Sequence, residues 1–217
     1  GKELGAEVAV VIDGQMVVDL WGGHRDVNRT VPWQKDTLVN VHSTTKGFTA
    51  ACVHRLADQG RVDIDQPVAH YWPEFARNGK GGITIRHVLC HRAGLPAIKE
   101  PLPAEAMFDW HTMTCALADQ APWWPPGTRH GYHAHTYGWL LGEVVRRVTG
   151  RSLGTYFREE IAGPLGLDFH IGLQERHHQR VAAVSKLPPP LPGTSPDLGY
   201  IMMTRPEDVT TKAFANP

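Results

Sequence analysis

Three things are scarce in this sequence: an excess of charge of one sign, long hydrophobic runs and paired cysteines. Its 22 Lys and Arg residues balance 22 Asp and Glu residues, so the formal net charge is zero. Such a balance lacks the basic footprint of a protein that binds nucleic acid or an anionic membrane surface. No apolar run approaches the ~20 residues that a transmembrane helix needs. We therefore expect no nucleic-acid partner and no membrane span.

The N-terminus and the cysteines bear on where the protein works. The chain opens Gly-Lys-Glu-Leu-Gly and has no basic segment followed by an apolar one, as a signal peptide would have. Its three cysteines, Cys52, Cys90 and Cys115, are odd in number and form no Cys-x-x-Cys pair. This argues against a disulfide framework and a Cys-rich zinc site. We expect a cytoplasmic protein.

The strand signals lie near the N-terminus. Apolar runs over 8–12 and 16–21 flank Asp13-Gly14, which predicts an antiparallel hairpin. A third short strand is expected over 38–41. After these strands, helical spacing and helix stop signals predict helices over 44–59, 84–89, 108–120, 137–149 and 153–161.

The sharpest chemical feature is the Ser-x-x-Lys motif of Ser43 and Lys46 at the start of the helix predicted over 44–59. Residues three apart on a helix share one face. A neutral Lys46 amine there could take the proton of the Ser43 hydroxyl, which requires a pKa well below the ordinary ~10.4. The plainer interpretation is a serine at a helix start followed by a surface lysine.

A second feature is Tyr132, in a loop just before the helix predicted over 137–149. A loop tyrosine near a Ser–Lys pair could move the proton between the serine and the leaving group. Taken alone, it could equally be a half-buried aromatic residue with a solvated hydroxyl.

Histidines and tryptophans are frequent around this loop. His130, His133 and His135 cluster and His177-His178 pair, but no Cys or acidic residue lies at ligand spacing, so we expect no metal. A histidine beside Tyr132 could instead tune the charge of the site.

Three tryptophans, Trp123, Trp124 and Trp139, either line an apolar acyl pocket or pack in the core. We expect His87 and His91 to satisfy backbone groups of loops rather than to take part in chemistry.

Taken together, four stretches in order resemble the serine β-lactamase / penicillin-binding-protein superfamily, and most of all the β-lactamase-related (class C-like) carboxylesterases. They occur between Leu4 and Leu173, and they cover 41–50 with the Ser-x-x-Lys motif, 60–68, 83–96 and 126–143.

The resemblance implies roles for named residues. Ser43 would be the acylated nucleophile, and its backbone N–H would be half of the oxyanion hole. Lys46 and Tyr132 would be the base and proton relay. Trp124, His133 and Ala134 would contact the substrate, which would be a small-molecule ester. No cofactor is implied.

Two departures from the family stand out. Tyr132-His133-Ala134 puts an alanine where relatives that act on β-lactams or peptides carry an asparagine amide, which favours an esterase. The third motif, Lys-Thr-Gly or a His/Trp-x-Gly variant on a C-terminal strand, is not found after Tyr200. We expect the chain to stop before the last strands of the sheet.

The predicted fold is therefore α/β (α+β) and β-lactamase-like, with an antiparallel sheet flanked by helices and a mostly helical region. Residues 1–60 would hold the hairpin and nucleophile helix, 61–185 the mostly helical region, and 186–217 a Pro-rich loop leading back toward the sheet.

The leading hypothesis for the function is a serine hydrolase that cleaves carboxylic esters through a Ser43 acyl-enzyme. The alternatives are a β-lactamase or D,D-peptidase-like penicillin-binding protein, an acyltransferase, and a non-catalytic scaffold of the same fold. The oligomeric state is left open.

Overall fold

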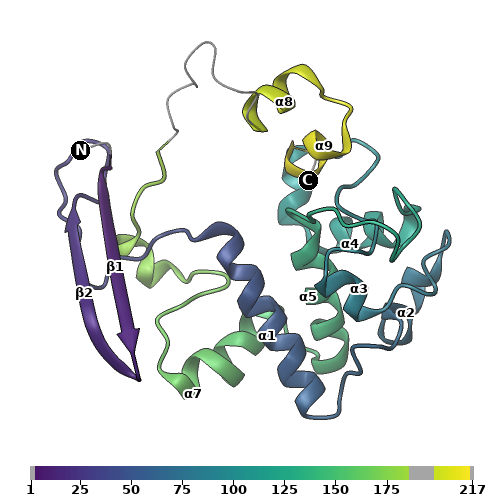
Figure 1. The fold of residues 1–217 in the computed structure, drawn as a ribbon, viewed down its shortest axis with the longest axis horizontal. Helices are drawn as coiled ribbons and strands as arrows, with labels where there is room; N and C mark the ends of the chain where they lie inside the picture. The colour runs from purple at the N-terminus through teal and green to yellow at the C-terminus, as the bar shows by residue number, and fades with distance from the viewer. Residues whose placement is uncertain (1–2, 186–197, 216–217) are drawn as a thin grey trace. The chain divides into compact units, whose positions relative to one another are not determined.

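The computed structural model describes residues 3–185 and 198–215, which fall into two compact units (Figure 1). One unit comprises the described residues of 1–42 and 172–192, and the other those of 43–171 and 193–217. Helix α1 (Thr45–Asp58) belongs to the second of these units, where it packs against α5 (Thr136–Thr149) and α6 (Leu153–Phe157), and the expected division at residue 60 stays a prediction.

The first unit contains the predicted hairpin, formed by strands β1 (Gly5–Ile12) and β2 (Gln15–Gly23). They pair antiparallel with Gly5 opposite Gly23. The turn residues Asp13 and Gly14 both have positive φ, at 50° and 76°. Two positive φ angles give a turn whose twist matches that of the strands, which confirms the Asp-Gly hairpin signal.

The strand predicted over 38–41 is wrong, because within the described residues this segment makes a single parallel bridge, between Leu38 and Val181. The Leu38 backbone N–H donates to the Arg180 carbonyl at 2.9 Å. Two residues further on, the Asn40 side chain accepts the backbone N–H of His42 at 2.9 Å. A side chain that takes up a nearby backbone donor in this way competes with strand pairing.

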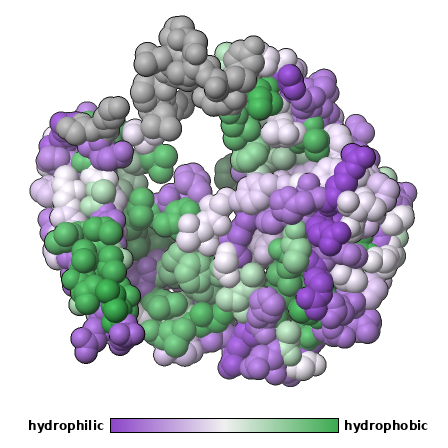
Figure 2. Space-filling model, in the orientation of Figure 1, coloured by the Kyte–Doolittle hydropathy of each residue, from purple (hydrophilic) through white to green (hydrophobic). Residues whose placement is uncertain are grey.

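Apolar side chains of the hairpin remain exposed and form a hydrophobic area over it (Figure 2). Consecutive residues such as Val10, Val11 and Ile12 point to opposite faces, so both faces are apolar. A two-stranded sheet is at best marginally stable by itself. The sequence of this hairpin is therefore typical of strands that are covered on both faces.

The described helices are short apart from α1, α4 and α5. In chain order they are the 3₁₀ turn η1 (His42–Thr44), α1, α2 (Val68–Tyr71), η2 (Pro73–Ala76), α3 (Ile85–Leu89), η3 (Ala104–Phe108), α4 (Trp110–Asp119), α5, α6, the π-helical turn η4 (Arg158–Ala162), α7 (Gly163–Leu165), η5 (Glu175–Arg180), α8 (Leu198–Thr204) and α9 (Val209–Ala215). Among these helices, none is long and apolar enough to cross a membrane.

Helices α1, α3, α4 and α5 confirm the predictions from helical spacing. Thr84 caps α3 as expected, since its side chain accepts the backbone N–H of His87 at 3.2 Å. The helix predicted over 153–161 is α6 continued by η4. Beyond it, Pro164 sits in the first turn of α7, where its missing N–H has no cost.

Helices α8 and α9 form where only irregular chain was expected. The rest of the predicted Pro-rich loop, 186–197, lies outside the described residues. Neither helix shows a strong apolar period in the sequence, so tertiary contacts decide their structure.

The core of the second unit lies around α5. Its apolar stripe of Leu140, Leu141, Val144 and Val145 is fully buried, as the spacing predicts. Trp139 is partly buried and packs against this core. Of the two interpretations of the tryptophans, core packing therefore holds for Trp139.

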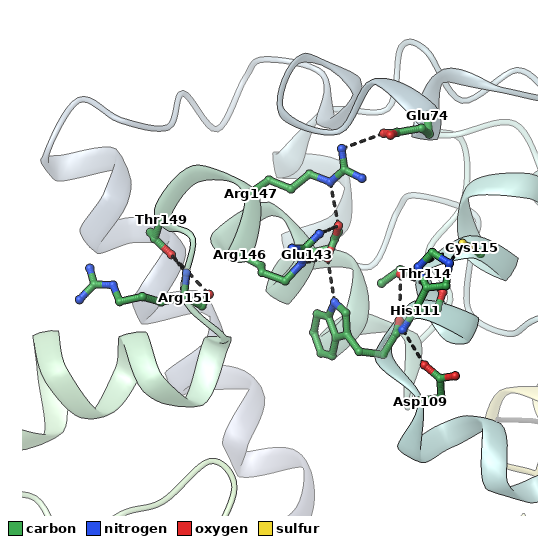
Figure 3. Close-up of polar contacts among 11 residues, drawn as sticks. Glu74, Asp109, His111, Thr114, Cys115, Glu143, Arg146, Arg147, Thr149 and Arg151 are labelled. Atoms are coloured by element: carbon green, nitrogen blue, oxygen red, sulfur yellow. Dashed lines mark hydrogen bonds and ion pairs between the residues drawn. The ribbon is translucent and has the colours of Figure 1, made fainter.

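Helix α5 also buries a carboxylate, Glu143, whose side chain is only 2% exposed. Arg146 and Arg147 each donate to it at 2.7 Å, and Trp110 of α4 donates its Nε1–H at 2.7 Å (Figure 3). Burial alone would raise the pKa of Glu143, but these hydrogen bonds outweigh it and lower the pKa to about 2. Glu143 thus joins α4 to α5 through charged hydrogen bonds.

We expect Glu143→Gln to destabilise the protein by about 3 kcal/mol, since removing one partner leaves the other charges without theirs. Because the pKa of Glu143 is lowered in the folded protein, the ionised side chain contributes fully to the free energy of unfolding above the ordinary pKa of 4.5. This contribution is lost as the pH falls toward 2. Urea unfolding between pH 7 and 3 should show that acid loss in the parent and much less of it in Glu143→Gln. The matched control is Glu105→Gln at an exposed position, and an equal loss in both variants would contradict the assignment.

Candidate active site

Ser43 and Lys46 lie together, as the Ser-x-x-Lys spacing predicts. Ser43 is in η1 and Lys46 is in the first turn of α1. The Lys46 Nζ lies 3.2 Å from the Ser43 Oγ, within hydrogen-bonding distance. Ser43 is exposed while Lys46 is half-buried, so an external group can reach the hydroxyl while the amine is held in place.

The Lys46 Nζ also donates to the backbone carbonyl of Ala134 at 2.6 Å. Ala134 lies in the loop that leads into α5, 88 positions along the chain. This bond joins helix α1 to the loop that carries Tyr132. The sequence did not predict the role of the Ala134 carbonyl, because every residue has a backbone carbonyl and the residue type does not show which one accepts a side-chain hydrogen bond.

Tyr132 completes the group. The Lys46 Nζ lies 4.8 Å from the centre of its ring. Burial raises the pKa of Tyr132, but the polar side chains of Ser43 and Lys46 and the Lys46 charge outweigh it, so the pKa lies below the ordinary value of 10.0. The three predicted catalytic residues therefore share one small polar cluster.

His133 lies beneath this cluster and is fully buried. Its Nε2 accepts the backbone N–H of Leu95 at 3.2 Å, and its Nδ1 lies 2.6 Å from the Gly131 carbonyl. These partners fix the tautomer with the proton on Nδ1. Burial lowers the pKa of His133 to about 4, so the ring is neutral near pH 7. Both ring nitrogens face backbone groups, so the His133 side chain holds the loop backbone in place.

Trp124 and Ala134 also face the protein. The Trp124 Nε1–H donates to the Arg129 carbonyl at 3.3 Å, and a Cβ at Gly131 would lie 2.4 Å from the Trp124 ring. Ala134 is buried in a small cluster with Ala97 and Ala213. Ala134 thus contacts Lys46 through its carbonyl, and Trp124 packs against Gly131, so these contacts shape the loop; the expected contacts of Trp124, His133 and Ala134 with substrate stay predictions.

Helix α9 brings a further residue to the site that sequence reasoning missed. The Phe214 ring centre lies 6.4 Å from that of Tyr132 and 6.5 Å from that of His135. Next to these residues lies a mostly apolar pocket of about 290 Å³, lined by Leu102, Ala104, Met107, His135, Phe214 and Ala215.

The clustered histidines form no metal site in the part of the chain that the structure describes, where no three His, Cys, Asp or Glu side chains gather suitably. His91 instead lies between the other rings, 5.9 Å from His130, 5.4 Å from His133 and 4.8 Å from Tyr132 by ring centres. As expected from the sequence, His87 and His91 both accept backbone N–H groups, those of Thr84 and His133.

Comparison with known proteins gives the family. A family model described as Beta-lactamase matches residues 1–208. The esterase/beta-lactamase LipL of Mycobacterium tuberculosis (strain ATCC 25618 / H37Rv) is 44% identical over 169 residues, which are 77% of this chain and 39% of that protein.

Two crystal structures are similar throughout the matched region. A penicillin-binding protein homologue from Caulobacter crescentus has 44% identity and a TM-score of 0.83, over 94% of this chain and 56% of its own. A family VIII carboxylesterase has 46% identity and a TM-score of 0.80, over 83% of this chain and 50% of its own. The chain thus spans about half the length of these relatives. It belongs to the β-lactamase family and has the α/β fold of that family.

Proposed function

We propose that the protein is a serine hydrolase that cleaves small carboxylic esters through an acyl-enzyme on Ser43. The observation that carries the proposal is the cluster of the Ser43 hydroxyl, the Lys46 amine at 3.2 Å and Tyr132, whose ring centre lies 4.8 Å from that amine. A nucleophile within reach of a base that a third group orients is the general arrangement for acyl transfer. The relatives named esterase and carboxylesterase support the same substrate class.

In the first step, the Tyr132 phenolate takes the proton of Ser43 while Oγ attacks the ester carbonyl carbon. The Lys46 ammonium favours this phenolate, and its bond to the Ala134 carbonyl keeps it in position. The backbone N–H of Ser43 donates to the oxyanion of the tetrahedral intermediate. When the bond to the alcohol oxygen breaks, Tyr132 returns the proton to the leaving alcohol.

In the second step, water replaces the alcohol. Tyr132 takes a proton from the water, whose oxygen attacks the acyl carbon, and the Ser43 Oγ leaves and is protonated again by Tyr132. The products are a carboxylic acid and free enzyme. An alcohol that enters in place of water gives acyl transfer by the same steps, so the acyltransferase alternative differs only in the acceptor.

The pocket beside Phe214 suits the acyl group. Its volume of about 290 Å³ is at the small end of ligand pockets, and most of its lining is apolar. Such a pocket accommodates a short acyl chain without a charged partner. This supports a simple ester over a substrate that carries a peptide side chain.

We expect Ser43→Ala to abolish covalent labelling by a fluorophosphonate, and Tyr132→Phe to slow it by about 10²–10³-fold, since positioned proton transfer contributes that much. Lys46→Ala should slow it similarly. Labelling rates would be followed by intact mass on this chain and on a form extended to the length of its relatives. The controls are Ser185→Ala and Lys35→Ala, both at exposed positions. Labelling that persists in Ser43→Ala in both forms would contradict the nucleophile.

The role of Tyr132 as the base can be tested by the pH dependence of acylation. Acylation should rise with pH through an apparent pKa below 10, because the phenolate of Tyr132 is the reactive form and its pKa is lowered. Replacing Lys46 with Met removes the neighbouring charge, so the pKa of Tyr132 should rise. The tyrosinate absorbance of each protein, less that of its Tyr132→Phe counterpart, reports this pKa directly. An unchanged titration in Lys46→Met would rule out the proposed electrostatic role.

A second candidate is a β-lactamase or penicillin-binding protein, which the names of some relatives favour. The side chain of Ala134 is buried against Ala97 and Ala213 and offers no amide to a β-lactam. We therefore expect no stable penicillin adduct under conditions where the ester probe labels Ser43. A lasting penicillin adduct on Ser43, seen by intact mass, would transfer the assignment to this second candidate.

A further inference from the structure

His91 has an unusual backbone for its residue type. It follows helix α3 with φ of +57°, in the left-handed region that favours glycine. The Arg92 N–H donates to the His87 carbonyl at 2.7 Å, and the His91 N–H to the Val88 carbonyl at 3.0 Å. This pair of bonds is the Schellman ending of a helix, in which glycine usually holds the left-handed position. A histidine there costs conformational energy that its side chain has to offset.

Two hydrogen bonds join His91 to the residues on either side of Tyr132. The His91 carbonyl accepts the backbone N–H of Gly131 at 3.1 Å. The His91 Nδ1 accepts the backbone N–H of His133 at 3.0 Å. Tyr132 itself lies in a loop without regular structure, so these bonds fix the backbone on both sides of it.

The imidazole ring of His91 also packs against aromatic rings of the site. Its centre lies 4.8 Å from that of Tyr132 and 4.9 Å from that of Tyr137, the latter in a stacked arrangement. Burial, together with the charges of His130 and Lys46, lowers the pKa of His91 to about 4. The ring is therefore neutral near pH 7, and Nδ1 keeps the lone pair that the His133 N–H needs.

We propose that His91 is a positioning residue for Tyr132, whose hydroxyl it holds against Ser43 and Lys46 through the loop backbone and through ring packing. This inference rests on the proposed function and assigns a role to a residue that touches neither the nucleophile nor the substrate. A misplacement of about 1 Å in a reacting group can cost ~10² in rate. The effect of losing His91 should therefore appear in the chemical step.

The test compares His91→Gly and His91→Asn with the parent. Glycine accepts the left-handed backbone without strain, so His91→Gly keeps the helix end but removes the ring and the Nδ1 acceptor. Asparagine also tolerates this backbone and offers an oxygen acceptor without the ring. The matched control is His87→Ala, which removes the side chain that accepts the Thr84 N–H at the start of α3 and whose ring lies against Gly127 rather than beside Tyr132.

We expect His91→Gly to slow fluorophosphonate labelling of Ser43 by about 10- to 100-fold at saturating probe, with little change in the half-saturating concentration. His91→Asn should recover part of the rate. The difference titration of the tyrosinate should show the pKa of Tyr132 moving up toward 10 in His91→Gly, since contacts with Ser43 and Lys46 are loosened. Circular dichroism on the same samples gives the folded fraction.

The outcomes separate this inference from the proposed function. Parent rates and a parent-like Tyr132 titration in His91→Gly would overturn the inference while Ser43 labelling in the parent still stands. A rate loss that only follows the folded fraction, as in His87→Ala, would also overturn it. If the parent does not label at Ser43 in the chain or its extended form, the proposed function fails, and the tyrosinate titration still decides whether His91 positions Tyr132.

Discussion

The site depends on one hydrogen bond, from the Lys46 Nζ to the Ala134 carbonyl at 2.6 Å. Lys46 belongs to the first turn of α1 and Ala134 to the loop before α5, so this bond brings together segments 88 positions apart. It leaves the same amine 3.2 Å from the Ser43 hydroxyl and next to the ring of Tyr132. A cation held between a carbonyl, a hydroxyl and a phenol ring is oriented before any substrate arrives, which is the preorganisation that the proposed acyl transfer requires.

The surroundings of the site serve to hold that arrangement. The loop around Tyr132 forms neither paired strands nor a helix, and hydrogen bonds to histidine side chains hold its backbone instead. His133 is buried and bonds backbone groups at both ring nitrogens, and His91 bonds the backbone on either side of Tyr132. Because burial lowers the pKa of both rings to about 4, they remain neutral acceptors near pH 7. Farther away, Glu143 joins α4 and α5 by charged hydrogen bonds in the same unit.

Much of this could be predicted from the sequence, because local signals decide it. The Asp13-Gly14 turn, the cap at Thr84 and the apolar stripe of α5 each depend on a few neighbouring residues. The proximity of Ser43 and Lys46 follows from helical spacing. The Ala134 carbonyl and the contact from Phe214 could not be predicted, since a backbone acceptor carries no residue signature and α9 takes its structure from tertiary contacts. The strand expected at Leu38 failed for a related reason, because Val181, its pairing partner among the described residues, is far along the chain.

The most direct test of the account is to locate the acyl group chemically. The chain, and a form extended to the length of its relatives, would be mixed with a p-nitrophenyl ester, quenched in acid within one turnover and mapped by peptide mass spectrometry. The account predicts an acyl group on Ser43 that is absent from Ser43→Ala and that decays as carboxylic acid appears. An acyl group on another residue, or none in either form while control labelling of a known serine esterase succeeds, would contradict it.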